Sequence, residues 1–205
     1  GNEEDASTIL FAAGVGGIVG AKVYYAILYG DWRLLFDRSG LVWYGGFIVA
    51  TAAVLWVIRR RQLPFWPLLD AATPALALGY GVGRIGCFLV GDDYGRPSDL
   101  PWAIAFPNGL PPTTAGYLRS EFALTIPPAV ADDQLLRVHP TQLYETALAF
   151  VIAWIGWRML CGPQGKQAGR TALVVFAALA VERFLVEFVR VKDDRLLAGL
   201  TVAQA

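Results

Sequence analysis

The chain has 205 residues, of which 56% are hydrophobic and only 17% are charged, and its 17 basic residues balance its 17 acidic residues. So high a hydrophobic content excludes intrinsic disorder. Soluble domains carry about 25% charged residues, so the low charged content indicates an integral membrane protein. The balanced charge argues against nucleic acid as a partner, because such binders carry a basic surface. Two cysteines and one histidine are too few for a disulfide framework, a thiolate zinc site or a multi-histidine metal centre.

Five apolar stretches approach the length of about 20 residues that crosses the hydrocarbon core of a bilayer. They cover residues 7–30, 39–58, 71–91, 140–157 and 171–189. The second stretch contains no charged residue, whereas the other four would also suit buried helices of a very apolar soluble protein. Five such stretches in one short chain favour the membrane. The sequence therefore predicts an all-α integral membrane protein, a single membrane domain over residues 1–205 with about five transmembrane helices.

Basic residues orient the predicted spans, because Lys and Arg concentrate in cytoplasmic loops. Residues 59–70 and 158–170 fall on one side and hold six of them: Arg59, Arg60, Arg61, Arg158, Lys166 and Arg170. The opposite side receives residues 91–139, which are rich in Pro, Gly and Asp and predict a small irregular head segment between the third and fourth spans, with short strands around Trp102–Phe106. The acidic first five residues lack the basic start of a signal peptide, so we expect none there.

Charged residues inside spans are the strongest functional signal, because a charge in hydrocarbon is costly unless it is paired or hydrated. The polar residues in and beside the spans crowd toward the predicted outer face: Arg84, Asp92, Asp93, His139, Glu145, Glu182, Arg183, Glu187 and Arg190. Arginine gives permanently charged, two-pronged contacts to phosphate. The pattern therefore favours a site for the phosphate of a phospholipid head group. A transporter would instead place charges near the bilayer midplane.

Each of these residues also has a purely structural alternative. Arg183 and Glu187, at i,i+4 spacing, could form an ordinary helical ion pair. Arg84 could extend to the head groups from near a helix end. His139 could be a helix-entry residue before a proline, and Asp92 could serve only the turn in which it lies. The residue pattern by itself leaves these alternatives open.

Three segments of the chain resemble the prolipoprotein diacylglyceryl transferase family. Residues 83–96, GRIGCFLVGDDYGR, are similar to the family signature. Residues 139–145, HPTQLYE, resemble its HPSQLYE segment, and residues 183–190, RFLVEFVR, its RFxxEFxR segment. Weaker similarities lie at residues 20–25 and 44–46. The matches follow the family order across nearly the whole chain.

The resemblance implies a multi-pass enzyme of the bacterial cytoplasmic (inner) membrane, with its active site toward the periplasmic face. Such an enzyme moves the diacylglyceryl group of phosphatidylglycerol onto the lipobox cysteine thiol of a prolipoprotein, and it needs no metal or organic cofactor. The implied partners are phosphatidylglycerol, the prolipoprotein signal peptide with its lipobox cysteine, and membrane lipids. Family members have seven spans, so the chain resembles the family core without the first and last helices.

The resemblance also assigns roles to individual residues. It implies catalytic roles for Arg84, Arg183, Tyr44 and His139. It implies contacts to phosphatidylglycerol from Arg84, Asp92, Glu187, Arg190, Cys87 and Tyr24. The chain departs from the family where Cys87 and Val90 replace asparagines and Asp92 replaces a glutamate. These departures support an alternative function, that of a catalytically impaired membrane paralogue that binds lipid or lipoprotein.

Overall fold

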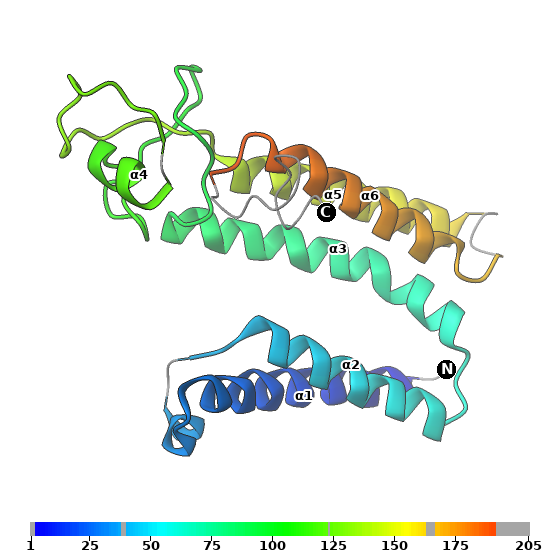
Figure 1. The fold of residues 1–205 in the computed structure, drawn as a ribbon. Helices are drawn as coiled ribbons and strands as arrows, with labels where there is room; N and C mark the ends of the chain where they lie inside the picture. The colour runs from blue at the N-terminus through cyan, green and yellow to red at the C-terminus, as the bar shows by residue number, and fades with distance from the viewer. Residues whose placement is uncertain (1–2, 38–39, 123, 163–166, 192–205) are drawn as a thin grey trace, which may run out of the picture. The chain divides into compact units, whose positions relative to one another are not determined.

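The computed structural model describes residues 3–37, 40–122, 124–162 and 167–191. Within these ranges the secondary structure consists of α-helices and one short 3-10 helix, and no strand is present, which confirms the predicted all-α class. The elements, in chain order, are α1 (Glu3–Tyr29), η1 (Trp32–Phe36), α2 (Trp43–Arg60), α3 (Phe65–Val90), α4 (Ala115–Phe122), α5 (Thr141–Cys161) and α6 (Arg170–Glu187) (Figure 1). Each predicted span coincides with one helix to within a few residues.

Three of the helices, α1, α3 and α5, are long and apolar enough to cross a membrane. The other two long helices have 18 residues each and carry charged residues: α2 ends in two arginines, and α6 contains Glu182, Arg183 and Glu187 in its second half. Large hydrophobic side chains are exposed along the helices, as expected of surfaces that face lipid. The chain is thus a helical membrane protein, while the count of five spans stays a prediction.

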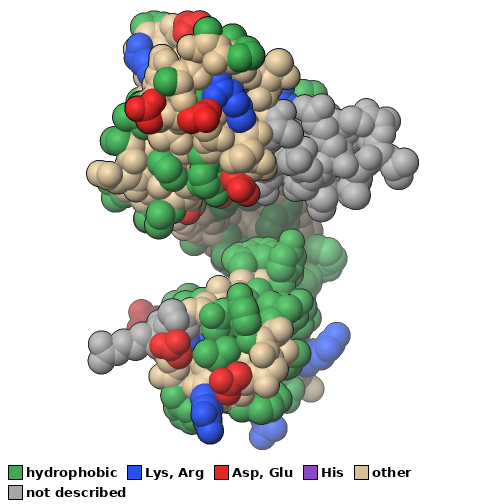
Figure 2. Space-filling model, turned by 60° about the vertical axis from the view of Figure 1, so that its left-hand side comes forward, with side chains coloured by type: hydrophobic (Ala, Val, Ile, Leu, Met, Phe, Trp, Pro, Cys, Tyr) green, Lys and Arg blue, Asp and Glu red, His purple; other side chains and the backbone are tan. Residues whose placement is uncertain are grey.

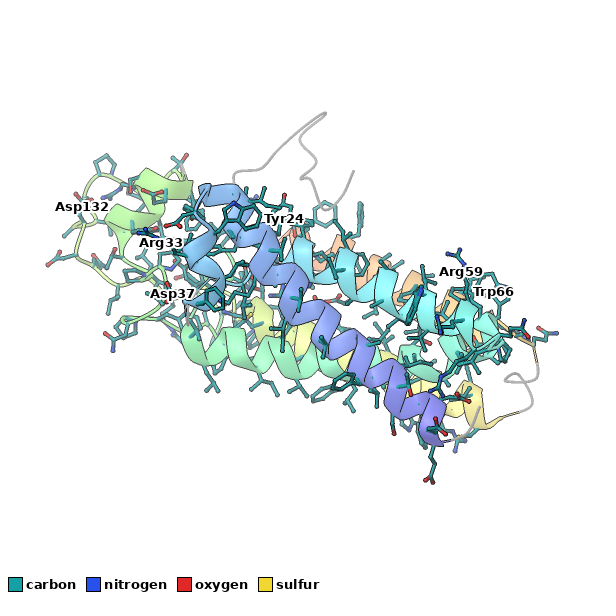
Figure 3. All side chains as sticks on the ribbon, turned by 90° about the horizontal axis from the view of Figure 1, so that it is seen from below. Tyr24, Arg33, Asp37, Arg59, Trp66 and Asp132 are labelled. Carbon is teal, nitrogen blue, oxygen red and sulfur yellow. The ribbon has the colours of Figure 1, made fainter. Side chains whose placement is uncertain are left out.

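The chain divides into two compact units, residues 1–68 and 69–205. In the first unit α1 and α2 approach so closely that small residues are required at their contact. A Cβ atom on Gly20 would lie 2.3 Å from the carbonyl oxygen of Gly45, and one on Gly45 would lie 2.3 Å from the Cβ atom of Tyr24. Such glycine contacts are typical of packed membrane helices. Tyr24 lies at one end of this unit and Arg59 at the other (Figure 3).

The second unit packs α3, α5 and α6 around a small apolar core formed by Ala77, Ile152, Ala153 and Val175. Buried Asp70, near the start of α3, fixes the beginning of α6. Its Oδ2 accepts the N–H of Gly169 at 2.6 Å, and its Oδ1 accepts the N–H of Ala172 at 2.7 Å. The first N–H groups of a helix have no partner within the helix, so a carboxylate from α3 supplies the cap that α6 lacks in its own sequence.

Residues 91–139 form an irregular segment between α3 and α5 that contains α4. Its core consists of Tyr94, Phe106, Leu118 and Val138. Instead of the short strands predicted around Trp102–Phe106, Ile104 makes a single isolated bridge to Val138, so that prediction is wrong for this described segment. Figure 2 looks toward this end and shows acidic and basic side chains exposed on it.

Candidate functional site

A buried carboxylate, Glu145 in the first turns of α5, is the centre of the polar site in the second unit. Its side chain is fully buried, and its Oε1 accepts hydrogen bonds from three side chains. The donors are Arg84 Nη2 at 2.7 Å, Arg183 Nη1 at 3.0 Å and the Tyr80 hydroxyl at 3.0 Å. Arg190 Nη1 lies 3.6 Å from the same oxygen. One carboxylate therefore gathers three arginines that are far apart in the sequence.

Two further carboxylates complete this arrangement, which we call the arginine–carboxylate cluster (Arg84, Asp93, Glu145, Arg183, Glu187 and Arg190). Asp93 pairs with Arg84 Nη1 at 2.9 Å and also with Arg190. Glu187, which is 3% exposed, lies 2.9 Å from Arg183 Nη2 one turn along α6. The three carboxylates and three guanidinium groups balance in charge, which is the condition for keeping such groups out of water.

The pKa of Asp93 reflects this environment. Burial by itself would raise the pKa of this carboxyl, but Arg190 and then Arg84 outweigh burial and lower the pKa from 3.8 to about 2. Asp93 is therefore ionised at any physiological pH. It lies just beyond the end of α3, in the left-handed conformation with φ of 57°.

Side chains at the start of α5 donate hydrogen bonds to backbone carbonyls of the signature, at the beginning of the head segment. The Thr141 hydroxyl donates to the carbonyl of Asp93 at 2.8 Å, and the Gln142 amide donates to the carbonyl of Asp92. Gly95 lies where no side chain fits, because a Cβ atom there would lie 2.6 Å from the carbonyl oxygen of Val189. These contacts bring the signature, the start of α5 and the residues after α6 together around Gly95. This close approach explains why the signature needs a glycine at position 95.

Several nitrogens of the cluster remain without partners. In the part of the chain that the structure describes, Arg84 Nε and Arg190 Nε and Nη1 are buried and have no hydrogen-bond acceptor. Buried polar groups nearly always find a partner, so unpaired donors need an explanation. Guanidinium nitrogens of this kind are suited to the oxygens of an anion such as phosphate.

Comparison with known proteins identifies the family. The family model described as prolipoprotein diacylglyceryl transferase matches residues 1–205. The chain belongs to this family.

Two bacterial relatives from this family are similar along most of the chain. The phosphatidylglycerol–prolipoprotein diacylglyceryl transferase of Vibrio cholerae is 31% identical over 201 residues, which cover 94% of this chain and 65% of the relative. The protein of the same name from Pseudomonas putida is 32% identical over 207 residues, which cover 95% of this chain and 68% of the relative. The chain thus spans about two thirds of the length of the curated relatives it matches.

The structure brings together four of the residues to which the family resemblance gave roles. Arg84, Arg183, Glu187 and Arg190 all belong to the arginine–carboxylate cluster. Arg183 therefore does more than form the i,i+4 ion pair with Glu187, since it also donates a hydrogen bond to Glu145. Arg84 does not simply extend toward head groups, because two carboxylates hold its guanidinium.

Cys87 and Asp92 lie beside the cluster. Arg84 Nη1 is 3.5 Å from the Cys87 sulfur, and one buried oxygen of Asp92 has no partner among the described residues. Ligand atoms of Cys87, Asp92 and Asp93 lie within 4.8 Å of one another, a spacing that would also suit a metal ion. A cation fits this set poorly, because Arg84 and Arg190 already occupy Asp93 and would repel it.

His139 lies in the loop that enters α5, half-buried, and contacts Tyr144 rather than the cluster. Its Nδ1 is 3.3 Å from the Tyr144 hydroxyl, and that hydroxyl accepts the indole N–H of Trp102 at 2.7 Å. The backbone of His139 is also fixed, because its carbonyl accepts the N–H of Gly95 at 2.8 Å. A catalytic role of the imidazole stays a prediction.

Tyr24 and Tyr44 lie in the first unit, on α1 and α2. Tyr24 packs its Cβ atom against Gly45, and the Tyr44 side chain is 65% exposed. A contribution of either tyrosine to the phosphate site stays a prediction.

Two members of the cluster received no role from the sequence. In the sequence, Glu145 and Asp93 stand out only among the polar residues near the predicted outer face, without a role of their own. The signal that could have found Glu145 was its isolation: a lone carboxylate in an apolar helix needs a cationic partner, and Arg84 is the lone charge of another span.

Proposed function

We propose that this chain carries the transfer centre of a phosphatidylglycerol–prolipoprotein diacylglyceryl transferase, which attaches a diacylglyceryl group to the lipobox cysteine of a prolipoprotein. The observation that supports it most strongly is the convergence of Arg84, Arg183 and Arg190 on Glu145, with guanidinium nitrogens left unpaired. Such a cluster offers an anionic phosphate several charge-assisted hydrogen bonds at once. The names of the relatives supply the substrate classes.

The proposed reaction is a displacement at the glyceryl carbon that bears the phosphate. The lipobox thiol gives its proton to a base, for which His139 and Tyr44 are the candidates, because the thiolate is the reactive form. A sulfur–carbon bond then forms, the carbon–oxygen bond to phosphate breaks, and the bonding electron pair leaves on the phosphate oxygen. Arg84 and Arg183 stabilise the charge that develops on this leaving group. Glu145 and Glu187 hold the two guanidinium groups in place, and Asp92 orients the glycerol hydroxyls.

Transfer can be measured directly with labelled phosphatidylglycerol and a lipobox peptide. Because the chain spans about two thirds of its relatives, we would assay it alone and extended with the segments of the Pseudomonas putida relative that it does not match. We expect the extended protein to label the peptide and to support growth of a strain depleted of its own transferase. No product from a folded, membrane-inserted protein that still binds phosphatidylglycerol would establish the alternative function, that of a lipid-binding paralogue.

We also propose that the protein lies in the bacterial cytoplasmic membrane with the arginine–carboxylate cluster toward the periplasm. Arg59, Arg60 and Arg61, at the C-terminal end of α2, support this orientation. With Cys87 and Cys161 changed to serine, single cysteines can be placed at Gln62 and Ser120, which are both exposed. We expect an impermeant maleimide to label Ser120→Cys in intact spheroplasts, and Gln62→Cys only after permeabilisation. Reversed labelling would overturn the orientation.

A further inference from the structure

A fourth buried carboxylate, Glu182 on α6, lies beside the cluster but has no partner in it. The residue is 3% exposed. Both of its carboxylate oxygens are buried and receive no hydrogen bond from any described residue. The oxygens of Glu187 also accept no hydrogen bond within the described ranges, but Glu187 forms an ion pair at 2.9 Å with Arg183, and Glu145 forms one at 2.7 Å with Arg84. Glu182 has no such ion pair among the described residues.

The groups that surround Glu182 are engaged elsewhere. It interacts electrostatically with Arg84 and Tyr80 on α3, with Glu145 on α5, with Arg183 on its own helix and with Arg190 just beyond α6. Arg84 and Arg183 donate to Glu145, as does the Tyr80 hydroxyl. Arg190 pairs with Asp93. The arginines thus form their ion pairs with other carboxylates and not with Glu182. A negative charge on Glu182 would also be repelled by Glu145.

Burial without a hydrogen-bond donor favours the neutral form of a carboxyl group, because the ionised form loses its hydration and gains no replacement. The charge balance points the same way. The three arginines of the cluster are matched by Asp93, Glu145 and Glu187, so a negative charge on Glu182 would make the site anionic before any phosphate enters.

We infer that Glu182 is held as a neutral carboxylic acid, and that its neutrality keeps the arginines of the cluster available to an anionic phosphate. Glu182 is then a positioning residue, since it acts through the charge of the site and not by contact with the reacting atoms. This inference rests on the proposed function for the identity of the anion. Ionisation of Glu182 at raised pH should therefore weaken lipid binding and leave the fold intact.

The protonation state can be tested without any turnover. A protonated carboxyl group gives an infrared C=O stretching band that a carboxylate lacks. With the extended protein in nanodiscs at neutral pH, we expect this band in the unaltered protein and its loss in Glu182→Gln. Glu121→Gln, on the exposed face of α4, is the matched control and should keep the band. An unchanged band in Glu182→Gln would overturn the inference.

The effect on the site can be tested by binding. Short-chain phosphatidylglycerol is titrated into the detergent-solubilised extended protein, and the Kd is followed by tryptophan fluorescence as the pH is raised. We expect the Kd to rise about tenfold or more once Glu182 ionises, the effect of one nearby like charge. Glu182→Gln should bind as tightly as the unaltered protein at neutral pH and lose this dependence, whereas Glu182→Asp should keep it.

These readouts separate the inference from the proposed function. A protein that transfers no lipid at any pH but shows the Glu182 band and the pH-dependent Kd contradicts the transferase and supports the inference. A protein that transfers lipid with the same pH dependence of Kd in Glu182→Gln supports the transferase and overturns the inference. Loss of phosphatidylglycerol binding by Glu182→Gln at neutral pH also overturns it.

Discussion

Arg84 Nη2 lies 2.7 Å from Oε1 of Glu145, which joins two residues that are 61 positions apart and lie on different helices. Each is the single charge in its predicted span, and each would be costly in the membrane without the other. Arg183 donates to the same oxygen at 3.0 Å. The cluster therefore ties α3, α5 and α6 together at the end where the head segment lies.

The two arginines can be tested by replacement. We expect Arg84→Ala and Arg183→Ala each to abolish or nearly abolish transfer, since loss of one donor to a developing negative charge costs about 2.7–4 kcal/mol in other enzymes. Lysine at position 84 should restore little, because a single ammonium group cannot contact Glu145 and Asp93 as the guanidinium fork does. The measurement is the initial rate of transfer to a lipobox peptide.

Arg158→Ala is the matched control for these replacements, because Arg158 is an exposed arginine in the last turn of α5. It should leave the rate unchanged. A near-normal rate in Arg183→Ala would reduce this residue to a structural ion pair.

Glu145 should matter for stability as well as for transfer. Glu145→Gln keeps the shape of the side chain but removes its charge, which leaves Arg84 and Arg183 partly uncompensated in a buried site. Breaking a buried ion pair in this way costs about 3–5 kcal/mol. Unfolding of the purified protein in detergent would measure this loss. The exposed Glu121→Gln should change the free energy of unfolding little, and an equal change in both variants would contradict a central role for Glu145.

The pKa of Asp93 predicts how stability depends on acid. Since the folded-state pKa is about 2 and the ordinary value is 3.8, ionised Asp93 favours the folded state. This contribution is complete above about pH 4 and is lost as the pH falls from 3.8 toward 2. Asp93→Asn should therefore be less stable than the unaltered protein at pH 5, and the difference should shrink by pH 2.5. A difference that stays constant over this range would contradict the assignment.

Asp70 is predicted to position α6 from the opposite end of α3. About 14 residues separate it from Arg84, or roughly 21 Å along a helix, so Asp70 is remote from the phosphate site. Asp70→Ala leaves the N–H groups of Gly169 and Ala172 without their acceptor. Each unsatisfied buried group costs about 1–3 kcal/mol, measurable by unfolding in detergent. Asp133→Ala, at an exposed position in the head, should cost almost nothing.

The helices could be predicted from the sequence because apolar length is a direct physical requirement of the bilayer. The stretch at residues 71–91, for example, coincides with α3 at Phe65–Val90. The head segment was harder to predict, because its order depends on contacts distant in sequence. The bridge from Ile104 to Val138 joins residues 34 positions apart and leaves no local pattern.

The site was partly predictable for the same reason. The arginines could be found one by one, since a charge in an apolar helix is conspicuous in the sequence. Their common acceptor, Glu145, could not be found in this way, because the packing of the helices decides which of several carboxylates contacts the arginines. Asp93 illustrates the limit: the sequence favours a turn at this position, and the structure adds ion pairs to Arg84 and Arg190.

The final prediction concerns the group that takes the thiol proton. His139 is the only histidine in the chain, and histidine is the residue type that most often serves as a general base, which makes it the first candidate. Its Nδ1, however, lies 3.3 Å from the Tyr144 hydroxyl, which accepts the indole N–H of Trp102, so the imidazole is engaged by side chains of the head segment and of α5. We therefore expect His139 to hold the loop in place. His139→Gln should keep substantial activity, while Tyr44→Phe should reduce it more.

Initial rates of both variants across pH 6 to 9, a range that brackets the ordinary pKa of histidine, would decide between them. The contrasting result is an inactive but folded His139→Gln together with a normal Tyr44→Phe, which would make His139 the base. Tyr144→Phe provides the control, because it removes the hydroxyl beside Nδ1 but keeps the ring. If His139 serves only to hold the loop, Tyr144→Phe and His139→Gln should lower stability alike and leave the pH dependence of transfer unchanged.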